Sequence, residues 1–180
     1  AGTLANRVLV GTNKLIKADA VTWVIGTNGN VWGETEIYHT GVLRIATADA
    51  IPTNSAVSFN PGFTGGRLDL NNFNQTIATL TGTGGVRTGA GAGGVLTLAS
   101  DGRSNTFVGS ISENGSFVKL GNSHVTLGAG SSFTGNLTVA GGTLQGGQNR
   151  ALQPGTTFGN VNNQRRINVQ SGAILRLQGR

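Results

Sequence analysis

Acidic side chains are the first residues to consider for chemistry, because hydrolases of polysaccharides use two neighbouring carboxylates, one as acid and one as base or nucleophile. The chain has seven acidic residues, and only Glu34 and Glu36 are near neighbours. At positions i and i+2 of a strand, their side chains would share one face. We expect this pair to be solvated on an outer face beside Trp32. We therefore expect no catalytic residues and no enzymatic activity.

The residue types give little support to metal, cofactor or thiol chemistry. His39 and His124 are too isolated to indicate a metal site, which normally needs three or four converging ligands. The chain has no cysteine, which excludes disulfides and thiolate ligands. Segment 82–85 is rich in glycine but lacks the Lys-Ser/Thr and the helix of a phosphate-binding loop. We expect neither a metal nor a cofactor.

Three aromatic residues with polar atoms, Trp23, Trp32 and Tyr38, lie close together in the sequence. On an exposed β face such rings form the usual surface for stacking against sugars, and they also favour protein interfaces. Trp32 and Tyr38 are therefore candidate contacts with a carbohydrate or a partner. The alternative places Trp23 and Trp32 in the core, and we favour it for the two tryptophans.

Glycine is the outlier of the composition, at 31 of 180 residues against a usual share of about 7%. Hydrophobic residues make up 37% of the chain, which argues against disorder, and charged residues only 11%. The formal charge of +6 could favour an acidic polysaccharide or a nucleic acid, but we favour the simpler interpretation that acidic residues are few. The one adjacent basic pair, Arg165-Arg166, is expected at a solvated loop tip. We expect no nucleic-acid partner.

Short runs of alternating apolar and polar residues recur along the chain, as expected for half-buried β-strands. Segments rich in Gly and Asn separate them and supply residues that accept positive φ. The pattern suits an antiparallel sandwich or a β-solenoid, and turn chemistry alone does not decide between them. The runs lie at 7–10, 21–25, 42–45, 56–59, 67–70, 76–80, 95–98, 117–120, 125–127, 137–139, 143–145, 167–169 and 174–177.

An internal repeat favours the solenoid. Residues 9–70 resemble residues 111–177 at a displacement of roughly one hundred residues, with Gly41-Val42-Leu43 matching Gly142-Thr143-Leu144. Stacked coils repeat their environments, whereas the strands of a sandwich do not. We predict one continuous domain, residues 1–180, that is an all-β, single-stranded, right-handed parallel β-helix. Coils of about 20 residues would each advance by about 4.8 Å, so the repeat would span about five coils.

The alternation also assigns a set of leucines to one shared interior column. These are Leu43, Leu68, Leu70, Leu127, Leu144, Leu175 and Leu177. Segment Arg87–Gly94 consists mainly of glycine and alanine, and we predict a protruding, flexible loop there.

One set of motifs resembles the passenger-associated transport repeat of bacterial autotransporters. In that family a Leu-Thr-Leu run precedes a Gly/Asn turn, an aromatic-Thr-Gly motif, an apolar strand and Gly-Gly-Thr-Leu. The corresponding segments here are Val125-Thr126-Leu127, Phe133-Thr134-Gly135, Leu137-Thr138-Val139 and Gly141-Gly142-Thr143-Leu144-Gln145. The first copy departs from the pattern, with Trp32-Gly33 in place of aromatic-Thr-Gly. The resemblance covers most of residues 9–180 and is specific for the fold rather than for an activity.

The resemblance implies a structural role in a secreted or surface-displayed bacterial protein. We expect a non-enzymatic β-helix that serves as a stalk or spacer and holds whatever lies beyond it away from the cell. One alternative is an extracellular filament or matrix subunit that stacks head to tail. A less favoured alternative is a carbohydrate-binding module whose ligand is a surface polysaccharide.

Both ends of the chain have the pattern of internal strands rather than of polar caps. We expect more polypeptide to cover them, either the rest of a longer chain or a second copy. In the second case, Val8 and Val10 would pack against Leu175 and Leu177 of a neighbour. The chain begins without methionine, which suggests a processed piece. No apolar run is long enough for a membrane helix, and we expect no membrane insertion by this segment.

Overall fold

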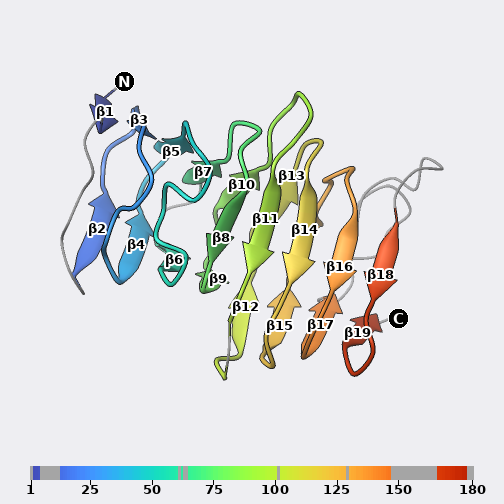
Figure 1. The fold of residues 1–180 in the computed structure, drawn as a ribbon. Coiled ribbons are helices and arrows are strands. Elements are labelled where there is room, and N and C mark those ends of the chain that lie inside the picture. The colour runs from blue at the N-terminus through green and yellow to red at the C-terminus, as the bar shows by residue number, and fades with distance from the viewer. Residues whose placement is uncertain are drawn as a thin grey trace.

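The computed structural model describes residues 2–4, 13–60, 62, 65–100, 102–128, 130–146 and 166–177. Every regular element in these residues is a β-strand. The strands stack along one axis, from the N-terminal end to the C-terminal end (Figure 1). They are β1 (Gly2–Leu4), β2 (Lys14–Lys17), β3 (Thr22–Ile25), β4 (Glu34–Ile37), β5 (Val42–Ile45), β6 (Ala56–Phe59), β7 (Arg67–Asp69), β8 (Gln75–Ile77), β9 (Thr79–Thr81), β10 (Gly85–Arg87), β11 (Val95–Leu98), β12 (Asn105–Phe107), β13 (Ser110–Ser112), β14 (Ser116–Lys119), β15 (His124–Leu127), β16 (Leu137–Val139), β17 (Thr143–Gly146), β18 (Ile167–Val169) and β19 (Ile174–Leu177).

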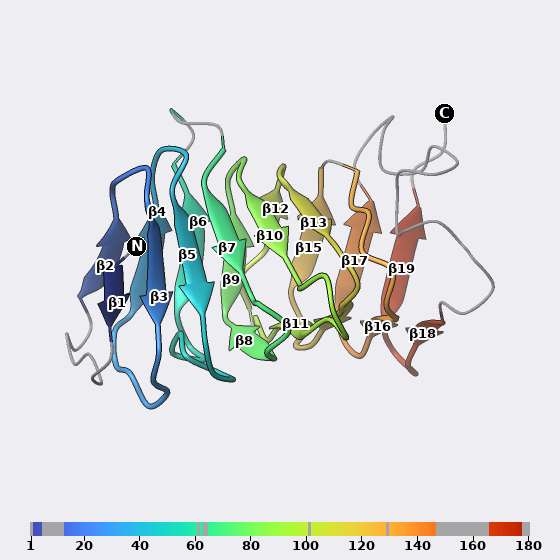
Figure 2. The same ribbon diagram turned by 90° about the horizontal axis from the view of Figure 1, so that it is seen from above.

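The strands form three faces around a common interior, and we name each face by its strands. The six-strand face has the order β1-β3-β5-β7-β10-β13, and the five-strand face has the order β8-β11-β14-β16-β18. The eight-strand face joins two sheets, β2-β4-β6-β9 and β12-β15-β17-β19, through a bridge between Gly82 and Phe107. A coil such as β9-β10-β11 passes through the eight-strand, six-strand and five-strand faces in turn. Figure 2 shows the same stack from above.

All strand pairs in the described residues are parallel and join successive coils. Thr22 lies opposite Val42 on the six-strand face, and Val95 lies opposite Ser116 on the five-strand face. These steps correspond to coils of roughly 20 residues, which is the length that one turn around three short strands and their corners requires. The prediction of a parallel β-solenoid is confirmed, and the antiparallel sandwich is excluded.

Alternation along the strands fills the interior as predicted. Leu43, Leu68, Leu70, Leu127 and Leu144 are buried in one apolar cluster that runs through the stack. Leu175 is partly buried against the same cluster. The remaining member of the predicted column, Leu177, is 52% exposed. Its placement in the interior was wrong, because it lies on the terminal strand β19, which pairs on one side only.

The two copies of the sequence repeat do not lie on the same face. Segment 42–45 forms β5 on the six-strand face, whereas the matching segment 143–146 forms β17 on the eight-strand face. The displacement therefore does not correspond to a whole number of coils, in contrast to the five coils predicted. The same sequence pattern can form strands on two different faces, because the strands of each face alternate inward apolar and outward polar residues.

The matched lysines of the repeat nevertheless make similar contacts with the backbone of the corner that follows them. Lys17 and Lys119 both point inward and are buried. The Lys17 ammonium donates to the carbonyl oxygen of Asp19 at 2.6 Å and also contacts the Asp19 carboxylate. The Lys119 ammonium donates to the carbonyl oxygens of Leu120 and Gly121 at 2.5 and 2.9 Å. In both copies the lysine satisfies carbonyl groups of the following corner, which compensates for the burial of its charge.

The glycine-rich loop after β10 extends beyond the neighbouring corners, as predicted (Figure 1), but polar side chains hold it on both sides. Asn72 Oδ1, from the preceding coil, accepts hydrogen bonds from the backbone N–H groups of Gly91 and Gly93 at 2.9 and 3.0 Å. Asn114 Nδ2, from the following coil, donates to the carbonyl oxygens of Ala90 and Gly91 at 2.7 and 3.1 Å. These hydrogen bonds restrain the loop, in contrast to the expected flexibility. The side chains that make them lie outside residues 87–94, so the composition of the loop did not reveal them.

Asn72→Gly tests how much these contacts contribute. Asn72 has a positive φ of 70°, which glycine accepts without strain, so the substitution removes only the side chain. We expect a loss of about 1 kcal/mol in the free energy of unfolding, since two backbone donors lose their acceptor. Hydrogen exchange should accelerate at Gly91 and Gly93 and stay unchanged at the buried strand β11. Unchanged exchange at both glycines would contradict the assignment.

Candidate functional site

The glutamate pair lies on the outer side of β4, as its spacing predicted. Lys14 of the neighbouring strand β2 lies opposite Glu34. Its ammonium contacts Glu34 Oε2 at 3.2 Å and donates to Glu36 Oε2 at 2.9 Å. The Glu34 side chain is largely exposed, whereas the Glu36 side chain is 16% exposed. One lysine thus bridges both carboxylates.

The electrostatics of this group favour the charged forms of Lys14 and Glu36. The hydrogen bond from Lys14 holds the pKa of Glu36 below its ordinary value, and smaller contributions come from hydrogen bonds to Tyr38 and Asn60. The same contact with Glu36, followed by the one with Glu34, raises the pKa of Lys14. Glu36 is therefore poorly suited to donate a proton as a general acid near neutral pH.

The two glutamates do not line the same surface hollow. A hollow of about 300 Å³ is lined by Glu34, Ala56, Ala78 and Arg103, among others, but not by Glu36. A hydrolase of polysaccharides would need both carboxylates on either side of the bond to be cleaved. In the part of the chain that the structure describes, this hollow offers one carboxylate and one guanidinium group.

Glu36→Gln should reveal the depressed pKa as a pH dependence of stability. A carboxylate with a lowered pKa in the folded state stabilises above its unfolded pKa, and the contribution disappears as the pH falls through the folded value. The difference in unfolding free energy between wild type and variant should therefore be greatest near neutral pH and decrease as the pH falls through the lowered pKa of Glu36. Urea denaturation at a series of pH values measures it. The control Ser58→Ala, on the neighbouring strand, should give a constant difference; a constant difference for Glu36→Gln would refute the ion pair.

The aromatic candidates divide between core and surface. Trp32 is 1% exposed, and its indole N–H donates to Thr35 Oγ1 at 2.8 Å. Thr35 Oγ1 in turn lies 3.0 Å from Ser55 Oγ of the next coil. This chain of polar atoms allows the ring to be buried with its donor satisfied. The structure thus removes Trp32 from the candidate contact surface and supports the core alternative.

The other two aromatic residues lie closer to solvent. Tyr38 is half-buried and hydrogen-bonded to Glu36, so its role as a partner contact stays a prediction. Trp23 packs against the end of the core, and its indole N–H donates to Asp19 Oδ2 at 2.8 Å.

The two histidines lie apart. His39 adopts a positive φ of 55° in the corner after β4, and His124 lies on β15. Among the described residues, no three His, Cys, Asp or Glu side chains lie close enough together to hold a metal ion.

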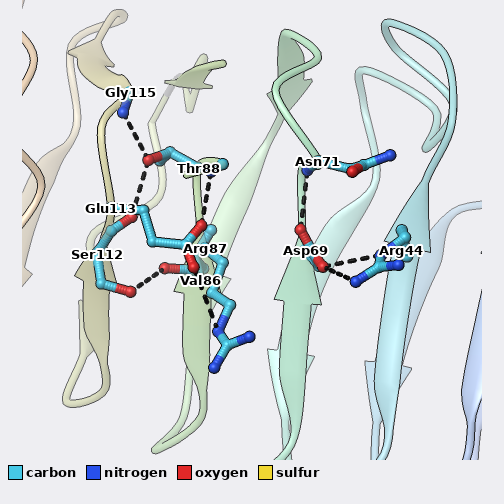
Figure 3. Close-up of polar contacts among 10 residues, drawn as sticks. Arg44, Asp69, Asn71, Val86, Arg87, Thr88, Ser112, Glu113 and Gly115 are labelled. Atoms are coloured by element: carbon cyan, nitrogen blue, oxygen red, sulfur yellow. Dashed lines mark hydrogen bonds and ion pairs between the residues drawn. The ribbon is translucent and has the colours of Figure 1, made fainter. Parts of the chain in front are cut away.

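A row of alternating charges on the six-strand face was not found from the sequence. Asp69 lies opposite Arg44 on one side and Arg87 on the other. Arg44 Nε and Nη2 contact Asp69 Oδ2 at 2.9 and 2.8 Å, and Arg87 Nε lies 3.6 Å from Glu113 Oε1. Figure 3 shows Asp69 between Arg44 and the backbone N–H of Asn71. The partners belong to different coils, so the row fixes the register of neighbouring coils on this face.

The two ends of the described stack are apolar. At the C-terminal end, side chains of β18 and β19 are roughly half exposed; they are Ile167, Val169, Ile174 and Leu177. At the N-terminal end, a hollow of about 370 Å³ is lined by Leu15, Trp23 and Leu43, among others. Val8 and Val10, the other half of the predicted stacking interface, lie outside the described residues. None of the described residues belongs to a helix that could cross a membrane.

Comparison with known proteins bears on the family of the chain. No protein-family model and no solved structure matches it. Among curated proteins, the chain is similar to the Adhesin BmaC autotransporter of Brucella suis biovar 1 (strain 1330), with 34% identity over 140 residues. The matched region is 76% of this chain but only 4% of that relative. The similarity and the stack of parallel coils together identify the chain as a β-helical segment of the bacterial autotransporter passenger family.

Proposed function

We propose that the chain is a stalk or spacer segment of a passenger displayed outside the bacterial cell, and that it has no catalytic activity. The observation that carries the proposal is the apolar cluster that successive coils share in the described part of the chain. Each coil adds one layer to this cluster and pairs with its neighbours above and below. The number of coils then sets the distance that the segment spans, at about 4.8 Å per coil.

The outer ion pairs support a rigid rather than a catalytic segment. Lys14 joins β2 to β4, and Arg44 joins β5 to β7. Arg87 joins β10 to the corner after β13. In each of these three cases the two charged groups form an ion pair that joins neighbouring coils. Because charges are sparse in this chain, few of them are left to converge on a substrate.

Removal of one whole coil tests the spacer proposal. Gly85 lies opposite Ser110, so deletion of residues 85–109 would bring β13 into the place of β10. We expect a folded protein that is shorter by about 4.8 Å along its axis in small-angle scattering. Deletion of residues 85–96 removes half a coil and should abolish cooperative unfolding, because inward and outward positions no longer match across the faces. Equal loss of structure in both deletions would refute a modular spacer.

The absence of catalysis has a separate test. Purified protein should release no products from neutral or acidic polysaccharides, since the described residues bring only the carboxylate of Glu34 to this hollow. Product release that disappears in both Glu34→Gln and Glu36→Gln would establish an enzyme instead.

Head-to-tail association is a second candidate, favoured by the apolar surface at both ends of the described stack. Exposed apolar edges of a β-sheet are covered by further strands in stable proteins. The relative is much longer than this chain, which supports cover by further coils of one polypeptide. Sedimentation at increasing concentration together with electron microscopy distinguishes the two versions. Fibres would support stacked copies, and particles of one constant size would support a segment of a longer chain.

A further inference from the structure

The chain contains two Asn-Gly pairs, Asn28-Gly29 and Asn114-Gly115, and the structure places them in very different environments. Both lie in corners between strands, where residues that accept tight turns are expected. An Asn-Gly pair can also deamidate, a reaction that is separate from its role in a turn. Because the two environments differ, we expect this reaction at one of the two sites only.

An asparagine followed by glycine can lose its side-chain amide without an enzyme. The backbone nitrogen of glycine attacks the asparagine side-chain carbonyl carbon, a C–N bond forms, and ammonia leaves with the side-chain nitrogen. Water then opens the resulting succinimide ring at either carbonyl and yields aspartate or isoaspartate. Glycine favours the attack because it has no Cβ to hinder it and accepts unusual backbone angles. The step needs a mobile asparagine side chain and a backbone nitrogen without a hydrogen-bond partner.

Asn114 satisfies neither condition. Its side-chain nitrogen donates to the carbonyl oxygens of Ala90 and Gly91 at 2.7 and 3.1 Å. The backbone N–H of Gly115, which would have to attack, donates to Thr88 Oγ1 at 2.8 Å. Figure 3 shows this contact between Thr88 and Gly115. Both reacting groups are therefore held in place by the loop of the preceding coil.

Asn28 and Gly29 are exposed, and neither makes a hydrogen bond to another described residue. The corner around them is nonetheless fixed. Asn30 Nδ2 donates to the carbonyl oxygens of Thr27 and Ala50, each at 2.7 Å, and Gly29 has a positive φ of 68°. Asn28 and Gly29 also line an open hollow of about 490 Å³ that Asp49 borders. Solvent therefore has access to the reacting groups and to the ring that would form.

We infer that Asn28 is a site of spontaneous deamidation in the folded protein, whereas Asn114 is protected until its corner opens. Conversion at Asn28 adds one negative charge to the hollow that Asp49 borders. The isoaspartate product also inserts one methylene group into the main chain at the corner between β3 and β4. The modification is confined to the outer surface and leaves the apolar cluster untouched.

Peptide mass spectrometry of the purified chain tests the inference. The folded protein is incubated in mildly alkaline buffer, digested, and followed by the one-dalton mass gain of the peptides that contain Asn28 and Asn114. We expect Asn28 to convert at least about tenfold faster than Asn114, and its rate to rise with pH because the attacking nitrogen must lose its proton. In concentrated denaturant both sites should convert at similar rates. The Asn28→Asp variant supplies the charge standard for ion-exchange chromatography.

Two results would overturn the inference. One is equal conversion of both sites in the folded protein, which would show that the hydrogen bonds at Asn114 confer no protection. The other is an unreactive Asn28 in the folded protein over a period in which denatured protein converts at both sites. The variant Thr88→Val provides a further check, because it removes the acceptor of the Gly115 N–H. Asn114 should then react faster. Asn28 lies several coils away and should keep its rate, which shows that the fold as a whole is unchanged.

Discussion

Leu144→Asp is expected to abolish stacking of the C-terminal coils. Leu144 lies on β17 between Val125 and Leu175 of the adjacent strands, and its side chain is fully buried. An aspartate there would place a carboxylate among the apolar side chains of the cluster, without a designed cationic partner. Leaving one buried charge uncompensated costs on the order of 4 kcal/mol. That is a large fraction of the total stability of about 5–15 kcal/mol of a typical domain.

The control for this substitution is the adjacent residue. Gln145 follows Leu144 on the same strand, and its side chain is directed outward and partly exposed. Gln145→Asp introduces the same charge on the solvent side, so its effect should stay within about 0.5 kcal/mol. Thermal denaturation followed by circular dichroism measures both variants. Similar melting temperatures for the two would show that Leu144 does not belong to a continuous interior.

The interior was predictable because alternation along a strand depends only on local sequence. Leu68 and Leu70 flank an outward Asp69, and this spacing alone assigns both leucines to the core. Leu177 shows the limit of that reasoning. The alternation gives the direction in which a side chain points, whereas its burial also requires a neighbouring strand on both sides.

Contacts between coils were not predictable, because they depend on the number of residues in each coil. The coil from Arg67 to Gly85 is shorter than the coil from Gly85 to Ser110. The partner of a given outward residue is therefore not found by counting a fixed period. For this reason the ion pair between Arg44 and Asp69 was missed.

The sequence favoured the core for Trp32 but did not establish its burial, for a related physical reason. The ring lies in a corner segment, where no alternation indicates the inward side. Thr35 of the same coil satisfies the indole donor directly, and Ser55 of the next coil completes the buried polar chain.

Gly115→Ala is the second substitution with a large expected effect, and it explains part of the high glycine content. Glycines at 94, 115 and 135 occupy the same corner in three successive coils. Gly135 N donates to Gly115 O at 2.9 Å, and Ser116 N donates to Gly94 O at 3.0 Å. A Cβ atom on Gly115 would lie 1.9 Å from Gly94 O and 2.5 Å from Thr88 Cβ. The contacts are with backbone and with a buried residue, so neither neighbour can move aside without separating the coils.

We expect Gly115→Ala to cost about 3 kcal/mol, near the upper end for overpacking a tightly packed site. Gly102→Ala is the matched control, since Gly102 has open space around the added Cβ but a positive φ of 73°. It should cost about 1 kcal/mol through backbone strain alone. Urea denaturation gives both values, and hydrogen exchange of the Ser116 amide reports whether the bond to Gly94 is lost. A larger effect at Gly102 than at Gly115 would mean that glycine is needed in these corners for its backbone freedom. The reverse order means that glycine is needed because successive coils approach too closely for any side chain.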